Sequence, residues 1–220
     1  MKNSSLPASA SSVSERTYQT LLENIVSRRI SPGEVLEERK IADELQVSRT
    51  PLRAALNRLL GEGIVARLSN GSVIVKNFGA TELLELLHIR LLLESEAAAL
   101  ACGRIPAETL APIKAHLQAI LENSAVTAEQ DWAADNLVHD VVASHCGNKT
   151  LAGLIHDARL KARLCNVERL PGRSTQARLE HLAIIDSLSS GDAEQARQAM
   201  AKHLNAVRNA FMKTLGYLHP

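Results

Sequence analysis

Four side chains in the second half of the chain have types and spacings suited to a divalent metal ion. Asp135 and His139 are four residues apart in a helical segment, which brings both onto one face. His181 lies in a later helical segment and His203 in the last one. Imidazole nitrogens with one carboxylate suit zinc or nickel and are a poor set for calcium. An Asp-x-x-x-His pair alone is more often a pair on a helix surface, so the spacing leaves both interpretations open.

A second group of side chains has the spacing of a DNA-reading helix. Residues 39–58 form two short helical runs joined by a turn. Ser48 is a suitable N-cap and Pro51 suits a first turn, which places Arg49, Thr50 and Arg53 at or near the end that usually enters the major groove. The apolar residues that can share one buried side are Ile41, Leu45, Leu52, Leu56 and Leu59. The alternative is a solvated amphipathic helix with ordinary surface arginines.

The next segment predicts a β-hairpin. Gly61 and Gly63 end the helix, and two short β-branched runs flank the pair Asn70-Gly71. A helix-turn-helix followed by a hairpin is a winged helix, whose tip at residues 69–71 would lie beside the reading helix. A first helix starting near Ser14 would cover the buried side of this head.

At this point the sequence resembles the DNA-binding domain of the GntR family of bacterial transcription regulators. The match spans roughly residues 15–78, and Ala54 stands where the family commonly has Glu. The matching residues are Pro32-Gly33, Leu36 to Arg39, Ile41-Ala42, Val47 to Arg53, Ala55-Leu56, Leu59, Glu62 to Val65 and Gly71. The resemblance implies that six positions approach phosphates and base edges: Arg39, Ser48, Arg49, Thr50, Arg53 and Gly71.

After residue 78 the pattern is helical throughout and shows no strand signal. The helices are expected at about 81–102, 108–123, 127–146, 150–168, 174–189 and 192–215, a bundle of about six. The leucines of the first of these helices are spread too widely for a single stripe, which predicts burial on more than one side. The expected organisation is a disordered tail at 1–13, a winged helix-turn-helix at 14–78 and a helical domain at 79–220, giving a mainly α fold.

The helical region resembles the FCD ligand-binding domain of the FadR-like branch of the same family. The resemblance rests on residues 135–139, 147–148, 180–188, 191–192, Ala196, Met200 and 203–204. It implies that Asp135, His139, His181 and His203 hold a divalent transition metal and that a small carboxylate effector can complete its coordination. Val138 replaces the Phe usual before the first His, a packing change that leaves the ligand set intact.

Arg90 is a further candidate, because a guanidinium fork matches a carboxylate. It lies four residues before Glu94, so it could bind the effector or form a salt bridge within its own helix.

Composition sets broader bounds. The net charge is +1, yet residues 1–78 hold 11 basic and 8 acidic residues, a surplus of +3, against −2 for the remainder. Three cysteines without a CxxC pair argue against a disulfide scaffold and for a reducing cytoplasm. No apolar run is long enough to span a membrane.

We therefore expect a cytoplasmic bacterial transcription regulator, associated with the nucleoid when bound to DNA. It would act as a homodimer on a palindromic operator, most often as a repressor, and respond to a small organic acid. The rivals are a metal-dependent enzyme and a regulator with a purely structural metal site. The enzyme is disfavoured because no Glu in these motifs is placed as a general base and the DNA-binding head would go unexplained.

Overall fold

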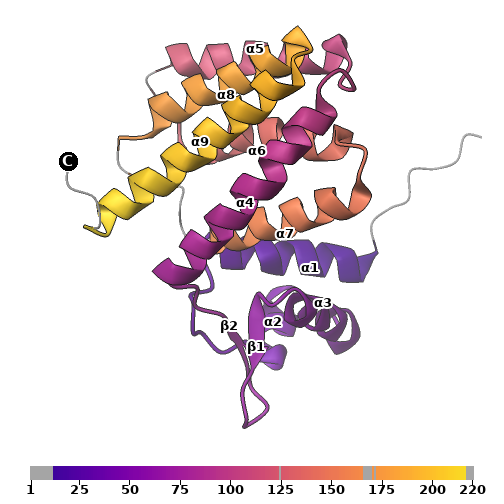
Figure 1. The fold of residues 1–220 in the computed structure, drawn as a ribbon. Coiled ribbons are helices and arrows are strands. Elements are labelled where there is room, and N and C mark those ends of the chain that lie inside the picture. The colour runs from indigo at the N-terminus through magenta and orange to yellow at the C-terminus, as the bar shows by residue number, and fades with distance from the viewer. Residues whose placement is uncertain (1–11, 124, 166–169, 171, 217–220) are drawn as a thin grey trace, which may run out of the picture. The chain divides into compact units, whose positions relative to one another are not determined.

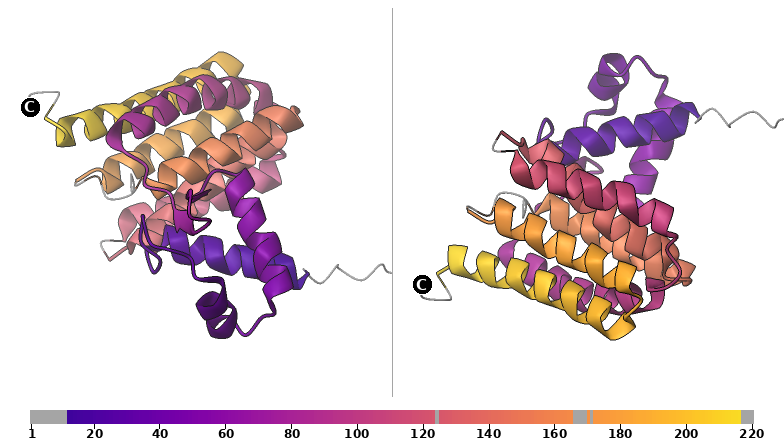
Figure 2. Two further views of the ribbon diagram at one scale, coloured as in Figure 1. Left: turned by 90° about the horizontal axis from the view of Figure 1, so that it is seen from below. Right: turned by 90° about the horizontal axis from the view of Figure 1, so that it is seen from above.

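The computed structural model describes residues 12–123, 125–165, 170 and 172–216. The predicted tail lies outside this range except for Ser12, which caps the first helix, and Val13, which begins it. The chain folds into two compact units, Met1–Asn77 and Phe78–Pro220, whose elements are labelled in Figure 1 and seen from two further sides in Figure 2. The prediction of a mainly helical protein with an N-terminal winged helix-turn-helix and a helical second domain is confirmed.

The first unit contains three helices and a two-stranded hairpin within the described residues. The helices are α1 (Val13–Val26), α2 (Glu38–Glu44) and α3 (Arg49–Gly61), and the strands are β1 (Val65–Arg67) and β2 (Val73–Val75). The strands are antiparallel, with Val65 opposite Val75 and Arg67 opposite Val73. Helices α1 and α3 pack on each other around Leu21, Leu52 and Leu59, none of which is exposed to solvent.

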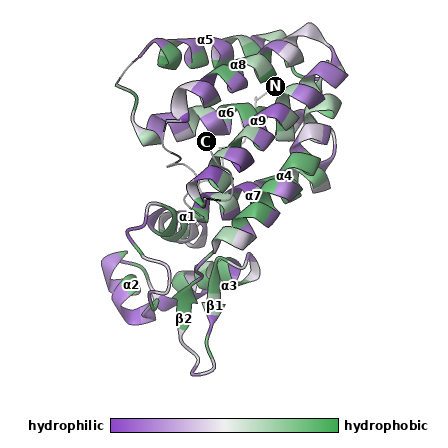
Figure 3. Cartoon of the chain, turned by 60° about the vertical axis from the view of Figure 1, so that its left-hand side comes forward, coloured by the Kyte–Doolittle hydropathy of each residue, from purple (hydrophilic) through white to green (hydrophobic). Residues whose placement is uncertain are grey.

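Some turns of the first unit contain a residue in the left-handed backbone conformation. Gln46 has a φ of 51° in the turn that joins α2 to α3, and Gly71 has a φ of 86° at the tip of the hairpin. Ser48 occupies the N-cap position of α3, as predicted, but its side chain makes no capping hydrogen bond. Figure 3 shows that α2 is largely hydrophilic, and its buried residues are Ile41 and Ala42.

The second unit has six helices in its described part. They are α4 (Ala80–Ala101), α5 (Ala107–Glu122), α6 (Ala128–His145), α7 (Lys149–Leu164), α8 (Ser174–Ser190) and α9 (Ala193–Thr214). Helix α4 packs against α6, α7 and α9, while α8 packs against α5, α6 and α9. The core between them is aliphatic and includes Leu117, Ile155, Ile184, Ile185 and Met200, each at most 1% exposed.

Helix α4 is only partly as expected. It is buried against three helices, in agreement with its wide spread of leucines, but Ile89 and Leu92 remain 45% and 56% exposed. Its buried positions also include two charged residues, Arg90 and Glu94, which a leucine-rich pattern does not reveal. No helix in the described ranges is long and apolar enough to cross a membrane.

Candidate functional site

Three helices of the second unit bring the four predicted metal ligands together. Helix α6 carries Asp135 and His139 one turn apart, α8 carries His181, and α9 carries His203. One ligand atom from each residue lies within 4.8 Å of the others. The three histidines are at most 3% exposed, whereas the Asp135 side chain is 21% exposed and forms the open side of the cluster.

Two of the histidine nitrogens in the cluster have no hydrogen-bond partner among the described residues. The Nε2 atoms of His139 and His181 are both buried and unpaired, at 3.5 Å and 3.3 Å from Asp135 Oδ1. The ring centroids of His181 and His203 are 4.5 Å apart. Buried polar atoms are normally satisfied, so two orphaned nitrogens converging on one carboxylate fit a metal that would bind them.

Two carboxylates fix the outer edges of the imidazole rings. Glu94 on α4 pairs with His139 Nδ1 in a very short contact, and Glu180 on α8 pairs with His203 Nδ1 at 2.9 Å. A ring that donates its Nδ1–H to a carboxylate presents the Nε2 lone pair to the opposite side, the arrangement common around protein-bound metals. Sequence reasoning missed both glutamates. Glu180 directly precedes His181, but nothing in the sequence links Glu94 to a histidine 45 residues away.

Buried or largely buried arginines compensate the carboxylates of Glu94, Asp135 and Glu180. Arg90 Nε donates to Glu94 at 2.6 Å, Arg159 Nη2 donates to Asp135 at 2.9 Å, and Arg173 Nη2 donates to Glu180 at 2.6 Å. Burying charges is costly unless they are paired and hydrogen-bonded, so these pairs are needed to keep the acids ionised. Both Arg159 and Arg173 were missed in the sequence. Arg159 on α7 pairs with Asp135 on α6, and Arg173 reaches Glu180 from the N-cap position of α8, seven residues earlier.

The electrostatics follow from this pairing. Burial alone would raise the pKa of Asp135, but His139 and Arg159 hold it well below its ordinary range. Burial likewise opposes ionisation of Glu94, and Arg90 with His139 lowers its pKa nonetheless.

The histidines are shifted toward the neutral form. Burial lowers the pKa of His203 to about 3, with a smaller contribution from His181, and burial also lowers the pKa of His181. The site therefore combines an ionised Asp135 with neutral imidazoles at these two positions, which is the protonation state that metal coordination requires.

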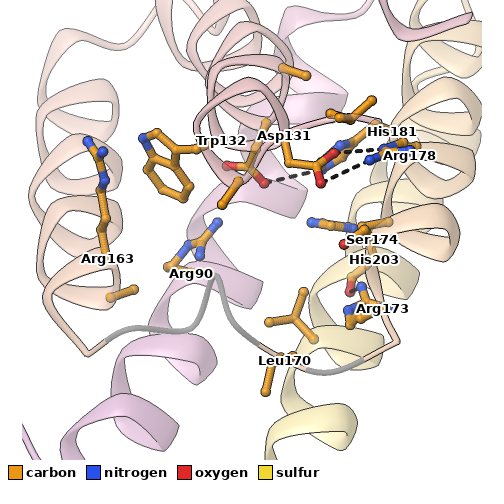
Figure 4. Close-up of a pocket in the computed structure, with 17 residues that line it drawn as sticks. Arg90, Asp131, Trp132, Arg163, Leu170, Arg173, Ser174, Arg178, His181 and His203 are labelled. Carbon is orange, nitrogen blue, oxygen red and sulfur yellow. Dashed lines mark hydrogen bonds and ion pairs between the residues drawn. The ribbon is translucent and has the colours of Figure 1, made fainter. Parts of the chain in front are cut away.

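A cavity of about 260 Å³ adjoins the cluster (Figure 4). His181 and His203 lie on one side of it, and Arg90 reaches into it from α4. Four arginines line the cavity: Arg90, Arg163, Arg173 and Arg178. Trp132 supplies an aromatic wall, with the guanidinium carbon of Arg163 at 4.6 Å from its ring centroid. The cavity therefore suits a small anion with an apolar or planar part.

Arg90 forms the salt bridge to Glu94 that the sequence left open, while its binding of an effector stays a prediction. It is 6% exposed and pairs with Glu94, and it also lines the cavity. Arg178 is similarly engaged, because it donates to both carboxylate oxygens of Asp131 at 2.7 Å and 3.0 Å (dashed lines in Figure 4).

The candidate DNA-contacting residues belong to the first unit and are described separately. All six are exposed: Arg39, Ser48, Arg49, Thr50, Arg53 and Gly71. Arg49 begins α3, and Arg53 follows one turn later. Arg53 Nε donates to Glu38 Oε2 at 2.8 Å, a contact that sequence reasoning did not anticipate. Neither arginine is packed into the core, so both can reach a ligand.

Two family models match the chain. The model of the FCD domain matches residues 85–206, a range that contains the four candidate ligands. The model of bacterial regulatory proteins of the gntR family matches residues 13–75, which contain the six candidate DNA-contacting residues.

Similar proteins are regulators of transcription. The Nta operon transcriptional regulator of Aminobacter aminovorans is 35% identical over 114 residues, covering 52% of this chain and 54% of the relative. The gluconate operon transcriptional repressor of Bacillus subtilis is 33% identical over 136 residues, covering 61% of this chain and 53% of the relative. The matched regions thus span about half the length of these two relatives.

Solved structures share the fold. The E. coli protein McbR/YncC aligns with a TM-score of 0.77 at 21% identity, covering 94% of this chain and all of that one. The Zn2+-bound FCD domain of the regulator TM0439 aligns with a TM-score of 0.52 at 23% identity, covering 63% of this chain and 97% of that one.

Proposed function

The chain belongs to the GntR family of bacterial regulators, in the branch that carries an FCD domain, and on this premise we propose that it is a metal-dependent sensor of a small organic acid. Its family and its relatives are transcription regulators, and like them it is a DNA-binding transcription regulator and not an enzyme. We further propose that it represses transcription, in keeping with the repressor among its relatives.

The observation that carries the metal proposal is the convergence of four ligand atoms on one point. Asp135, His139, His181 and His203 offer one carboxylate oxygen and three nitrogens within 4.8 Å of one another. Zinc and nickel are the best candidates for this donor set, and an FCD domain of similar fold binds Zn2+. A bound ion would supply a fixed positive charge beside the cavity and would satisfy the unpaired Nε2 atoms.

The arginine-lined cavity supports an acidic effector. Arg90, Arg173 and Arg178 are held in place by Glu94, Glu180 and Asp131, so their guanidinium groups are preorganised. A small carboxylate in the cavity would meet these donors together with the charge of the ion. Arg90 is the residue we assign to effector binding, because it contacts both the cavity and the buried network around His139.

DNA binding is assigned to the exposed face of the first unit. Arg49 and Arg53 would read guanine edges, while Arg39, Ser48, Thr50 and the backbone at Gly71 would contact phosphates. A single reading helix contacts few base pairs, so we propose a homodimer on a palindromic operator. The exposed Ile89 and Leu92, three residues apart on α4, are an apolar face that a second copy could cover.

Regulation requires that the effector prefer one arrangement of the dimer. A ligand that binds two arrangements equally well shifts neither, so the acid must bind the DNA-competent and the incompetent state with different affinities.

The test begins with metal content. The full chain, stripped with a chelator and reconstituted with zinc or nickel, should hold about one ion per chain by elemental analysis. The double variant His181→Ala, His203→Ala should hold almost none, while His156→Ala, which removes an exposed histidine of α7, should match the unmodified chain. Full occupancy in the double variant would reject the assignment of the ligands.

Titration with organic acids then separates a sensor from its rivals. A true effector raises thermal stability and alters operator affinity together, because binding to the folded state stabilises it. Metal uptake without any response to acids would leave a purely structural site, and turnover of an acid would point to an enzyme.

A further inference from the structure

The face of the first unit that we assign to DNA also carries a carboxylate. Glu38 is the first residue of α2 and precedes Arg39, one of the proposed DNA contacts. Its Oε2 accepts a hydrogen bond from Arg53 Nε at 2.8 Å, which links α2 to α3 across fifteen residues of sequence. A carboxylate repels the phosphate backbone, so phosphate binding alone does not explain a glutamate at this position.

The pair has little effect on stability. The side chains of Arg53 and Glu38 are 62% and 35% exposed, and exposed ion pairs are weak because water and salt screen them. The main effect of Glu38 is therefore expected on the orientation of the Arg53 side chain toward DNA. A guanidinium group has five N–H donors in a rigid fork, and one whose Nε–H is engaged can still donate from Nη1 and Nη2. Those two nitrogens match O6 and N7 of guanine.

We propose that Glu38 is a positioning residue for DNA specificity: it holds Arg53 in the orientation that reads a guanine and weakens binding to DNA that lacks one there. This inference rests on the proposed DNA-binding role of α3. On non-specific DNA, Arg53 gains most by turning toward a phosphate, and Glu38 opposes that turn by its hydrogen bond and by its own charge. Specificity is a difference between two affinities, so lowering the non-specific one increases it.

Helix α2 offers a matched control. Glu44 is also exposed, ends the same helix, and forms an ion pair with Lys40 at 3.9 Å. Glu44→Ala removes the same charge from the same helix as Glu38→Ala but leaves Arg53 with its partner. A general charge effect should therefore appear in both variants, and a positioning effect in Glu38→Ala alone.

The experiment measures the affinity of the full chain for two kinds of duplex. One is selected from a random pool by the unmodified protein, and the other is the same duplex with its half-sites scrambled. We expect Glu38→Ala to tighten binding to the scrambled duplex and to lower the ratio of the two affinities about tenfold, within the range of a lost bidentate base contact. Its non-specific binding should also depend more steeply on salt, by about one unit of slope, because Arg53 is freed for a phosphate.

Base substitution within the selected site locates the contact. In the unmodified protein and in Glu44→Ala, replacing one G·C pair in each half-site should weaken binding, and in Glu38→Ala and Arg53→Ala this preference should disappear. Equal behaviour of the two alanine variants, or a preserved preference in Glu38→Ala with unchanged thermal stability, would overturn the inference. Failure of the unmodified chain to select any sequence would instead overturn the proposed function.

Discussion

Replacing His203 with glutamine tests the metal site without dismantling its surroundings. Glutamine is similar in size to histidine and retains an N–H that can donate to Glu180, the present partner of His203 Nδ1 at 2.9 Å. The variant should therefore fold, while losing one of the four ligand atoms that lie within 4.8 Å of one another.

The size of the effect follows from linkage. At a free zinc concentration one hundred times the dissociation constant, binding stabilises the folded chain by about 2.7 kcal/mol. For a protein of this size, that corresponds to a rise in Tm of about 5–11 °C. Loss of a direct ligand should weaken binding by about a hundredfold or more, since even outer partners of the ligands account for about 10–100-fold. At the same zinc concentration the stabilisation would then fall to about 0.4 kcal/mol, a rise of about 1–2 °C.

The assay is differential scanning calorimetry of the chelator-treated chain with and without buffered zinc. His156→Gln serves as the control, because this histidine is exposed on α7 and should leave the zinc-dependent rise intact. A rise in His203→Gln as large as that of the unmodified chain, at the same free zinc, would refute the assignment of His203 as a ligand.

Three further predictions concern pH, DNA and assembly. Burial lowers the pKa of His203 to about 3 and lowers that of His181, so between pH 6.5 and about 3 the unfolded metal-free chain binds more protons than the folded one. Its free energy of unfolding, measured by urea titration with chelator, should fall as pH falls below 6.5, by up to about 1.4 kcal/mol per pH unit for each group; a flat profile would contradict these shifts. Arg49→Ala should weaken binding to a selected duplex by roughly 5–150-fold while leaving zinc uptake unchanged, and an unaltered footprint would count against the reading role of α3. Leu92→Glu should shift the mass measured by light scattering from dimer toward monomer, whereas Leu179→Glu, at another exposed leucine, should not; dimers in both variants would exclude this face of α4.

The head of the molecule was predictable because its signals are local. Short stretches of sequence specify its main features: the turn after α2, the N-cap at Ser48 and the hairpin turn at Asn70-Gly71. The helices and strands begin and end close to the expected positions. The side-chain contacts were less predictable. Ser48 makes no capping hydrogen bond, and the pairing of Arg53 with Glu38 depends on how α2 and α3 pack.

The site in the second unit shows the same division. The spacing of Asp135 and His139 places both on one helix face. His181 and His203 were candidates from their residue type and helical setting, and the resemblance to FCD domains supported them as further ligands. Their supporting groups could not be found this way. Glu94 and Arg159 reach the ligands from α4 and α7 through tertiary packing, and a sequence pattern of period 3.6 says nothing about contacts between helices.

The leucine pattern of α4 correctly predicted burial on more than one side, but it did not show which residues are buried. Leu83 and Leu87 are buried, whereas Ile89 and Leu92 are exposed to solvent. The hydrophobicity of these residues does not distinguish the two pairs. The pattern also hid Arg90 and Glu94, whose burial depends on partners from other turns and helices.

The coupling between the two units is tested most directly by the affinity of the zinc-loaded full chain for a selected duplex, measured by fluorescence anisotropy across a panel of small mono- and dicarboxylic acids. We predict that at least one acid changes this affinity by about 5–150-fold, and that the change is lost in the double variant His181→Ala, His203→Ala. An affinity that no acid alters, or one that changes equally in the double variant, would contradict a metal-dependent sensor.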